Sequence, residues 1–359
     1  MTHSMRLGLN LGYWGAGNDK FNVTLAEEAD RLGYSVVWVA EAYGSDAPTV
    51  LSFIGARTEQ IHLGAAVMQI PARTPAMTAM TAATLDSLSG GRFRLGLGVS
   101  GPQVSEGWHG VRFDAPLART REYVDIVRMA LRREVVAYDG RHFTLPLPDG
   151  PGKALKLGVR PMREDQIPVY LAAVGPKNLE LTGEIADGWL AIFFAPEFAG
   201  ELVGSIETGA RRAGKGSQGG SPLAGFDIVP TVPVVVTDDL DYAYAAVSGY
   251  AALYIGGMGS REKNFYNQLA CRMGFEKEAK LIQDLYLDGR ARDAAAAVPR
   301  EFLDSTSLLG PRERIRDRLA AYVEAGVTTL SVAPYGPSME HRRAIVRTMA
   351  EVAQEAGLG

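Results

Sequence analysis

The chain has 359 residues, of which 47% are apolar and 22% are charged, and its formal net charge is −4 at pH 7. This composition is typical of a globular protein with a large core, and the slightly acidic balance gives no electrostatic sign of binding to nucleic acid or to an anionic membrane. The single cysteine, Cys271, excludes an internal disulfide, and the five histidines show no metal-ligand spacing. We therefore expect no metal site.

The first hundred residues alternate apolar runs with helical patterns. Strands are expected at 6–14, 35–44, 61–70 and 93–99, and helices at 23–32, at 47–58 and between Pro75 and the Gly90-Gly91 stop. The strands 61–70 and 93–99 are apolar on both faces, which is typical of a parallel sheet covered by helices.

The same alternation continues to the end of the chain. After a helix at 115–134, Asp139-Gly140 between two β-rich runs predicts a hairpin. Further strands are expected at 167–175, 188–194, 226–237 and 328–334, further helices at 176–186, 197–213, 240–253, 311–325 and 338–356, and a mainly helical insertion at 256–300.

Eight strands alternating with helices favour a single α/β domain, a (β/α)8 TIM barrel over 1–359, rather than a doubly wound open sheet. The hairpin follows the fourth helix of this barrel, and the helical insertion follows the seventh. Functional residues of such barrels lie at the carboxyl ends of the strands. Two of these ends carry Ala66, Val67, Met68 and Gln69, and then Val99, Ser100 and Gly101.

Gly96, Gly98 and Gly101 also match the dinucleotide pattern G-x-G-x-x-G. That pattern requires a helix that opens at its last glycine, with amide N–H groups directed at a pyrophosphate. The following residues, PQVSEGWHG, show no helical periodicity. We therefore favour the interpretation that these glycines pack inside a closed barrel.

Four stretches spread over most of the chain carry a resemblance to a known family. They are VWVAEAYGSDA, LGAAVMQIPARTPAMTAMTAATLDSLSGGRFRLGLGVSGPQVSEGWHG, YLAAVGPKNLELTGEIADGW and GGMGSREKNFYN. Together they resemble the luciferase-like flavin and deazaflavin oxidoreductases, and within them the branch that uses coenzyme F420. The resemblance implies a (β/α)8 barrel, a homodimer and a tricyclic ring that lies over the carboxyl ends of the strands.

The resemblance also implies where the cofactor binds. A non-prolyl cis peptide between Ala66 and Val67, next to Met68, is expected to support the ring, and Ser100 and Gly101 are expected to touch it. A turn after the fifth strand is expected to hold the phosphate, where amide N–H groups, a helix dipole and a cation meet. Its residues are Gly175, Pro176, Lys177 and Asn178.

A deazaflavin exchanges a hydride, so the protein has to stack a substrate on the ring and supply one acid or base. Glu41, at the end of the second strand, is the first candidate, and a carboxylate that orders a neighbouring loop or the cofactor is the alternative. His109, in EGWHG, is the second candidate, and a loop-fixing histidine is equally compatible with the pattern.

Aromatic residues at the rim formed by the carboxyl ends of the strands are candidates for a substrate pocket. Tyr13, Trp14 and Trp108 are expected to line it, with simple packing as the alternative. In the insertion, Arg261, Lys263, Asn264 and Tyr266 are expected to form a lid, unless they are a solvated surface.

One position departs from the resemblance. Family members that act on sugar phosphates carry a glutamate directly after the glycine at 101, and this chain has Pro102 there. We therefore expect a coenzyme F420-dependent oxidoreductase that acts on an unidentified small organic substrate. An FMN-dependent monooxygenase and a non-catalytic cofactor-binding protein are the alternatives. Because the chain has no signal-peptide pattern and no apolar run of about 18 residues, we expect it in the cytoplasm.

Overall fold

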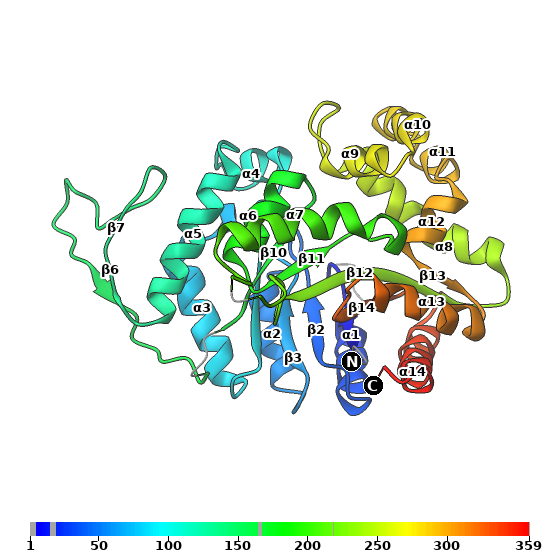
Figure 1. Ribbon diagram of the computed structural model, residues 1–359, viewed down its shortest axis with the longest axis horizontal. Helices are drawn as coiled ribbons and strands as arrows, with labels where there is room; N and C mark the ends of the chain where they lie inside the picture. Colours follow the sequence, from blue (N-terminus) through cyan, green and yellow to red (C-terminus); the bar gives the residue numbers. More distant parts are fainter. Residues whose placement is uncertain (1–4, 15–18, 164–166, 218, 359) are drawn as a thin grey trace.

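Eight parallel strands close into a ring in the computed structural model, which describes residues 5–14, 19–163, 167–217 and 219–358 (Figure 1). Each strand pairs with the next, and the last pairs with the first, so the expected (β/α)8 barrel is confirmed. In order, the strands are β1 (Arg6–Asn10), β2 (Val36–Val39), β3 (His62–Ala65), β5 (Phe93–Gly98), β10 (Val169–Ala172), β11 (Gly188–Ala191), β12 (Asp227–Val236) and β14 (Thr329–Pro334).

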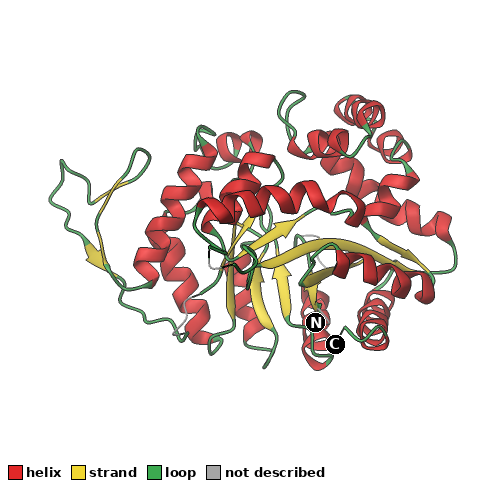
Figure 2. Cartoon of the chain, viewed as in Figure 1, coloured by secondary structure: helices red, strands yellow, loops and turns green. Residues whose placement is uncertain are grey.

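Long helices cover the outside of this ring (Figure 2). They are α1 (Asp19–Arg31), α2 (Ala47–Gly55), α3 (Pro75–Leu88), α5 (Pro116–Leu131), α6 (Pro176–Ile185), α7 (Ala199–Arg212), α8 (Leu240–Ala252), α13 (Arg312–Glu324) and α14 (Met339–Glu355). Short helical turns are η1 (Ile70–Ala72) and η2 (Pro196–Phe198).

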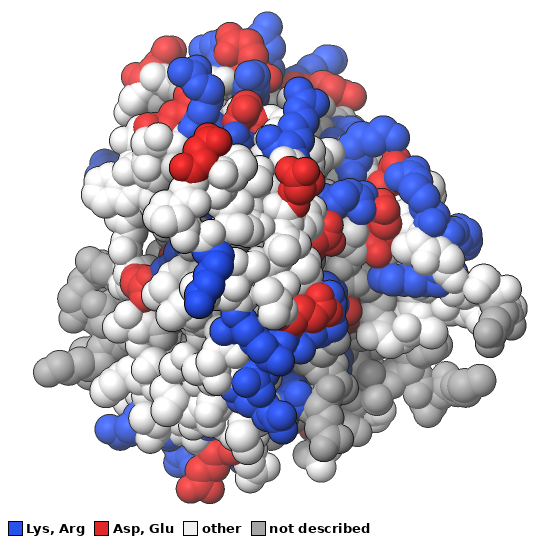
Figure 3. All heavy atoms as spheres, turned by 90° about the vertical axis from the view of Figure 1, so that its left-hand side faces the viewer, with Lys and Arg blue, Asp and Glu red and all other residues white. Residues whose placement is uncertain are grey.

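Two insertions extend from the barrel where the sequence predicts them. A projecting arm is built from β6 (Val135–Val136), β7 (Tyr138–Asp139), β8 (Thr144–Leu145) and β9 (Leu155–Lys156). The helical insertion comprises η3 (Leu253–Gly257), α9 (Phe265–Arg272), α10 (Glu276–Leu287), α11 (Ala291–Ala296) and α12 (Arg300–Thr306), followed by β13 (Leu308–Gly310), which pairs with β12. On the side that bears the arm and α5, basic and acidic side chains stand among a broad area of other residues (Figure 3).

The hairpin in the arm is present, but its connection is longer than Asp139-Gly140 alone. Asp139 pairs with Thr144, so the loop runs over 140–143. The carboxylate of Glu122 on α5 accepts the N–H groups of residues 141, 142 and 143 at 2.8 to 3.0 Å. This side chain stabilises the wider loop by satisfying backbone donors that a two-residue turn would not expose.

Two local expectations were wrong. A short helix, α4 (Pro102–Gly107), does open after Gly101, with proline at its first turn. Six residues are too few to show helical periodicity, whereas proline is favoured at the first helical position. The run 61–70 is not one strand, because the cis peptide Ala66–Val67 separates β3 from β4 (Met68–Gln69).

The barrel interior explains the glycines. Trp38 and Tyr170 pack edge to face inside it, with ring centroids 5.2 Å apart. A Cβ atom on Gly64 would lie 2.2 Å from the Trp38 ring, and one on Gly96 would lie 1.8 Å from the carbonyl oxygen of Ala65. The expected packing of glycines inside a closed barrel therefore describes Gly96, and the barrel itself rules out the Rossmann interpretation.

A buried carboxylate joins its own strand to four others at the amino-terminal end of the barrel. Asp227, the first residue of β12, contacts Arg6 of β1 at 3.1 Å and Arg94 of β5 at 3.2 Å. It also accepts the hydroxyls of Tyr170 at 2.9 Å and Thr329 at 2.8 Å. A buried charge is tolerated when it is paired and hydrogen-bonded, and this cluster meets both conditions.

His62 lies at the same end, at the start of β3, in a strongly positive environment. Its pKa is lowered to about 4, mostly by burial and in addition by the charges of Arg94, Arg163, Arg92 and Arg6. The folded state therefore resists protonation of a ring that the unfolded chain protonates near pH 6.5.

We expect this difference to make the protein acid-sensitive. Between pH 6.5 and about 4 the unfolded chain binds a proton at His62 that the folded chain does not, so the free energy of unfolding falls as the pH falls. In His62→Gln the decrease in the free energy of unfolding that comes from protonation of His62 is absent. Urea unfolding at pH 7 and pH 5 should show a smaller decrease for the variant, and an equal decrease would contradict the assignment.

Candidate functional site

The cis peptide that the resemblance implied is present at Ala66–Val67, at the carboxyl end of β3. A Cβ atom on Gly98 would lie 2.5 Å from Cγ2 of Val67, so glycine at this position lets the bulge pack against β5. Met68 is only 1% exposed. Ala66 and Val67 are therefore the residues of the bulge that a ligand can reach.

Ser100 and Gly101 face the bulge from the end of β5. Ser100 adopts a left-handed conformation with φ of 61°, and its hydroxyl donates to the side-chain oxygen of Gln69 at 2.9 Å. The Gln69 amide in turn donates to the carbonyl of Ala42 at 2.7 Å. A Cβ atom on Gly101 would meet only Gln103, at 3.9 Å, so space is open there.

Glu41 is buried and fully engaged. Its carboxylate accepts the backbone N–H groups of Ala47 and Gln69, both at 3.0 Å, and forms a two-pronged ion pair with Arg73. Arg73 also pairs with Asp46. These contacts favour the second of the two roles expected for Glu41, a carboxylate that orders neighbouring loops.

His109 lies in the turn that follows α4. Its backbone N–H donates to the carbonyl of Val104 at 3.1 Å. The ring atom Nε2 is covered and has no hydrogen-bond partner among the described residues. Buried polar atoms nearly always have partners, so this atom is a candidate for bonding to a ligand or water. The adjacent Trp108 is 66% exposed and projects from the rim.

The expected phosphate turn opens α6. Gly175 is the N-cap residue, and its carbonyl accepts the N–H groups of Asn178 and Leu179, both at 3.0 Å. A Cβ atom on Gly175 would meet nothing within 4 Å, and Oδ1 of Asn178 is buried without a partner among the described residues. The ammonium of Lys177 pairs with Glu180 at 2.9 Å, so it contributes charge beside the turn while it is directed along the helix.

The expected substrate residues divide into two groups. Tyr13 is half exposed, and its hydroxyl lies 3.2 Å from the hydroxyl of Tyr254. Trp14 is 7% exposed and belongs to the main hydrophobic core, so the packing alternative describes it.

Sequence reasoning missed an aromatic cluster that brings the insertion to the rim. Tyr254, on the π-helical turn η3, packs against Tyr250, Tyr266 and Phe193 with ring centroids 4.9, 4.8 and 5.9 Å apart. Burial raises the pKa of Tyr13 and holds that of Tyr254 well above its ordinary value. Both hydroxyls are therefore protonated at neutral pH and can donate hydrogen bonds.

The expected lid residues are mostly structural. Asn264 is 1% exposed, caps α9 and donates to the carbonyls of Tyr254 and Ile255. Tyr266 belongs to the aromatic cluster, and Arg261 pairs with Asp284 on α10. Lys263 is exposed, as the solvated alternative describes.

Cys271 is half-buried on α9, and burial raises the pKa of its thiol, as suits a packing role. Among the described residues, no group of His, Cys, Asp and Glu side chains is arranged to hold a metal ion. Within the same residues, no helix has the length and apolar character needed to span a bilayer.

Comparison with known proteins agrees with this geometry. The family model described as luciferase-like monooxygenase matches residues 12–329. The chain belongs to this family. A protein of Mycobacterium tuberculosis named "Putative coenzyme F420-dependent oxidoreductase" is 45% identical over 337 residues, which cover 92% of this chain and 96% of that protein.

Two reductases are more distantly similar to this chain. The 5,10-methylenetetrahydromethanopterin reductase of Archaeoglobus fulgidus is 28% identical over 89% of this chain and 90% of its own length. The solved structure of the coenzyme F420-dependent tetrahydromethanopterin reductase of Methanopyrus kandleri superposes with a TM-score of 0.80 at 24% identity, covering 97% of this chain and 98% of that one. The second comparison supports the fold alone.

Proposed function

We propose that this member of the luciferase-like family is a coenzyme F420-dependent oxidoreductase that transfers a hydride between the deazaflavin ring and a small organic substrate. The observation that carries the proposal is the set of small residues Ala66, Ser100 and Gly101 after the carboxyl ends of β3 and β5, at the same rim as the open helix N-terminus at Gly175. The name of the 45% identical relative supports coenzyme F420 as the cofactor.

The residues at the rim fit such a group. A flat ring needs backbone without bulky side chains, and Ala66, Val67, Ser100 and Gly101 provide it. A phosphate needs open space at a helix N-terminus, and α6 offers it beside Gly175. Pro176 has no N–H and those of Asn178 and Leu179 donate to Gly175, so the N–H of Lys177 is the donor that the first turn leaves for a phosphate. The unpartnered Oδ1 of Asn178 is an acceptor for a ligand hydroxyl at the same place.

When bound, the deazaflavin supplies or accepts the hydride. The residues of the chain bind and orient the cofactor and the substrate, and they move the proton. We assign the proton to His109, because Nε2 is covered and has no partner within the described structure, and an imidazole nitrogen can donate or accept a proton. We assign Glu41 as a positioning residue, since it holds Gln69, and Gln69 holds Ser100. One of the hydroxyls of Tyr13 and Tyr254 donates to the other, which leaves one O–H as a donor for a substrate oxygen.

The first test is binding of the cofactor. Oxidised coenzyme F420 should quench the protein's fluorescence at low concentration, and FMN should bind more weakly. Gly175→Leu should weaken binding of coenzyme F420 at least about tenfold. The leucine side chain fills the space before the turn, so the phosphate loses its charge-assisted contact with the helix N-terminus.

Gly200→Leu is the matched control, since a Cβ atom there also meets nothing within 4 Å, at the start of another helix. It should bind as the natural protein does. Tighter binding of FMN would instead support the monooxygenase alternative, and binding of neither cofactor would remove the phosphate assignment at Gly175.

The second test separates the proton from the scaffold. With any hydride acceptor found in a screen, His109→Gln should lower kcat by about 10² to 10⁴ while leaving cofactor binding unchanged. Glu41→Gln should weaken cofactor binding and lower the free energy of unfolding together, because Arg73 loses its buried partner. If neither variant changes turnover, both assignments are wrong, and a protein inactive toward a broad panel would favour a carrier.

We also infer a homodimer formed through α2 and α3. Phe53, Met77, Met80 and Leu88 lie on these two adjoining helices and are between 50% and 75% exposed. Positions 77, 80 and 88 share one face of α3, and an exposed apolar patch of this kind marks an interaction surface.

Sedimentation can test this surface. The natural protein should sediment as a dimer, and Met80→Glu should shift it toward the monomer, because a charge in an apolar interface is unpaired. Leu147→Glu, at another exposed apolar position, on the arm, should stay dimeric. A natural protein that sediments as a monomer would refute the inference.

A further inference from the structure

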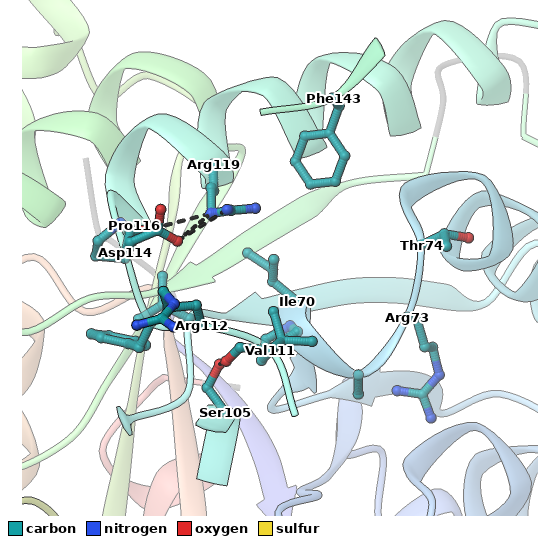
Figure 4. A pocket seen from close by; sticks show the side chains of 14 residues that line it. Ile70, Arg73, Thr74, Ser105, Val111, Arg112, Asp114, Pro116, Arg119 and Phe143 are labelled. Atoms are coloured by element: carbon teal, nitrogen blue, oxygen red, sulfur yellow. Dashed lines mark hydrogen bonds and ion pairs between the residues drawn. The ribbon is translucent and has the colours of Figure 1, made fainter. Parts of the chain in front are cut away.

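A cavity lies beside the rim, outside the proposed cofactor site. Its volume is about 310 Å³, at the lower end of the range for small-molecule pockets. Its walls come from η1, the end of β5, α4, the loop 111–114 and the start of α5, with Phe143 of the arm above (Figure 4). None of the residues assigned above to cofactor, substrate or proton lines it, although Arg73, the ion-pair partner of Glu41, forms part of its wall.

Most of the wall is apolar. Ile70 and Val111 face each other at its centre, and Val99, Phe113 and Phe143 complete the surface. Val99 and Phe113 come from segments on either side of α4, while Phe143 comes from the arm. A ligand in this cavity therefore needs an apolar body.

Positive charge borders the apolar wall. Arg119 is neutralised, because its guanidinium holds Asp114 at 3.0 Å. Arg112 lies on the same side of the cavity, and it has no hydrogen bond or ion pair among the described residues. Its charge is therefore available to a ligand.

The helices add to this charge. The N-termini of α3 and α5 both border the cavity, at Thr74 and Pro116. These helices have 14 and 16 residues, so each places partial positive charge at its first turn. A cation and two helix N-termini beside an apolar wall match a ligand with one anionic end.

We propose that this cavity binds an organic monocarboxylate, with its carboxylate on Arg112 and its apolar chain between Ile70, Val111 and Phe143. The site is independent of hydride transfer, so it does not depend on the function proposed above. Its position does bring the ligand next to the rim, because Ile70 follows Gln69 and Val99 precedes Ser100.

Calorimetric titration of the full chain with octanoate, without any cofactor, tests the proposal. Octanoate should bind saturably at one site, and 1-octanol, which has the same chain without the charge, should bind at least about tenfold more weakly. Arg112→Ala should weaken octanoate binding by a similar factor, and it should leave octanol binding unchanged. Arg112 is exposed, so its replacement leaves the core intact.

Arg292→Ala is the matched control, because Arg292 is also an exposed arginine with no ion pair in the described part of the chain. It should bind octanoate as the natural protein does. Val111→Trp should abolish binding of both ligands by filling the cavity, and circular dichroism should show that this variant is folded. Absence of saturable octanoate binding, or equal binding by Arg112→Ala, would overturn the proposal.

The titration also separates this inference from the cofactor assignment. Arg112→Ala should bind coenzyme F420 as the natural protein does, and Gly175→Leu should bind octanoate normally. A loss of both ligands in either variant would mean that the two sites are one, which would contradict the independence of the cavity.

Discussion

The ion pair between Glu41 and Arg73 holds together the rim at the carboxyl ends of the barrel strands. One carboxylate holds the backbone at Ala47, the backbone at Gln69 and the guanidinium of Arg73, so it links the loop after β2 to the segment after β3. Gln69 passes this constraint to Ser100 at the end of β5. The ends of three consecutive strands are therefore fixed relative to one another by one buried charge.

The barrel was predictable because its signals are local. Each strand is a short apolar run bounded by glycine, proline or polar residues, and each long helix has its own periodicity, so the alternation could be read along the chain. The rim positions followed from the rule that places function at the strand ends. The short elements α4 and β13 were missed, since six and three residues are too few to show a period.

Contacts between distant residues could not be predicted in the same way. Glu41 and Arg73 are 32 positions apart, and the sequence gives no sign that they pair with each other. The cluster of Tyr13, Phe193, Tyr254 and Tyr266 depends on how the helical insertion folds back over the barrel. Glu122 stabilises the wider hairpin loop, although it lies on a helix and about 20 positions before the loop in the sequence. Tertiary packing decides each of these features.

The polar cluster around Asp227 lies at the end of the barrel opposite to the rim. Arg6, Asp227 and Thr329 are each the first residue of their strand, whereas Ala66, Ser100 and Gly175 follow the last residues of theirs. The groups that tie the strands together are thus separated from the groups that meet a ligand by the full length of the barrel. Selection for a new substrate and selection for folding can therefore act on different residues, and the rim can diverge without loss of the scaffold.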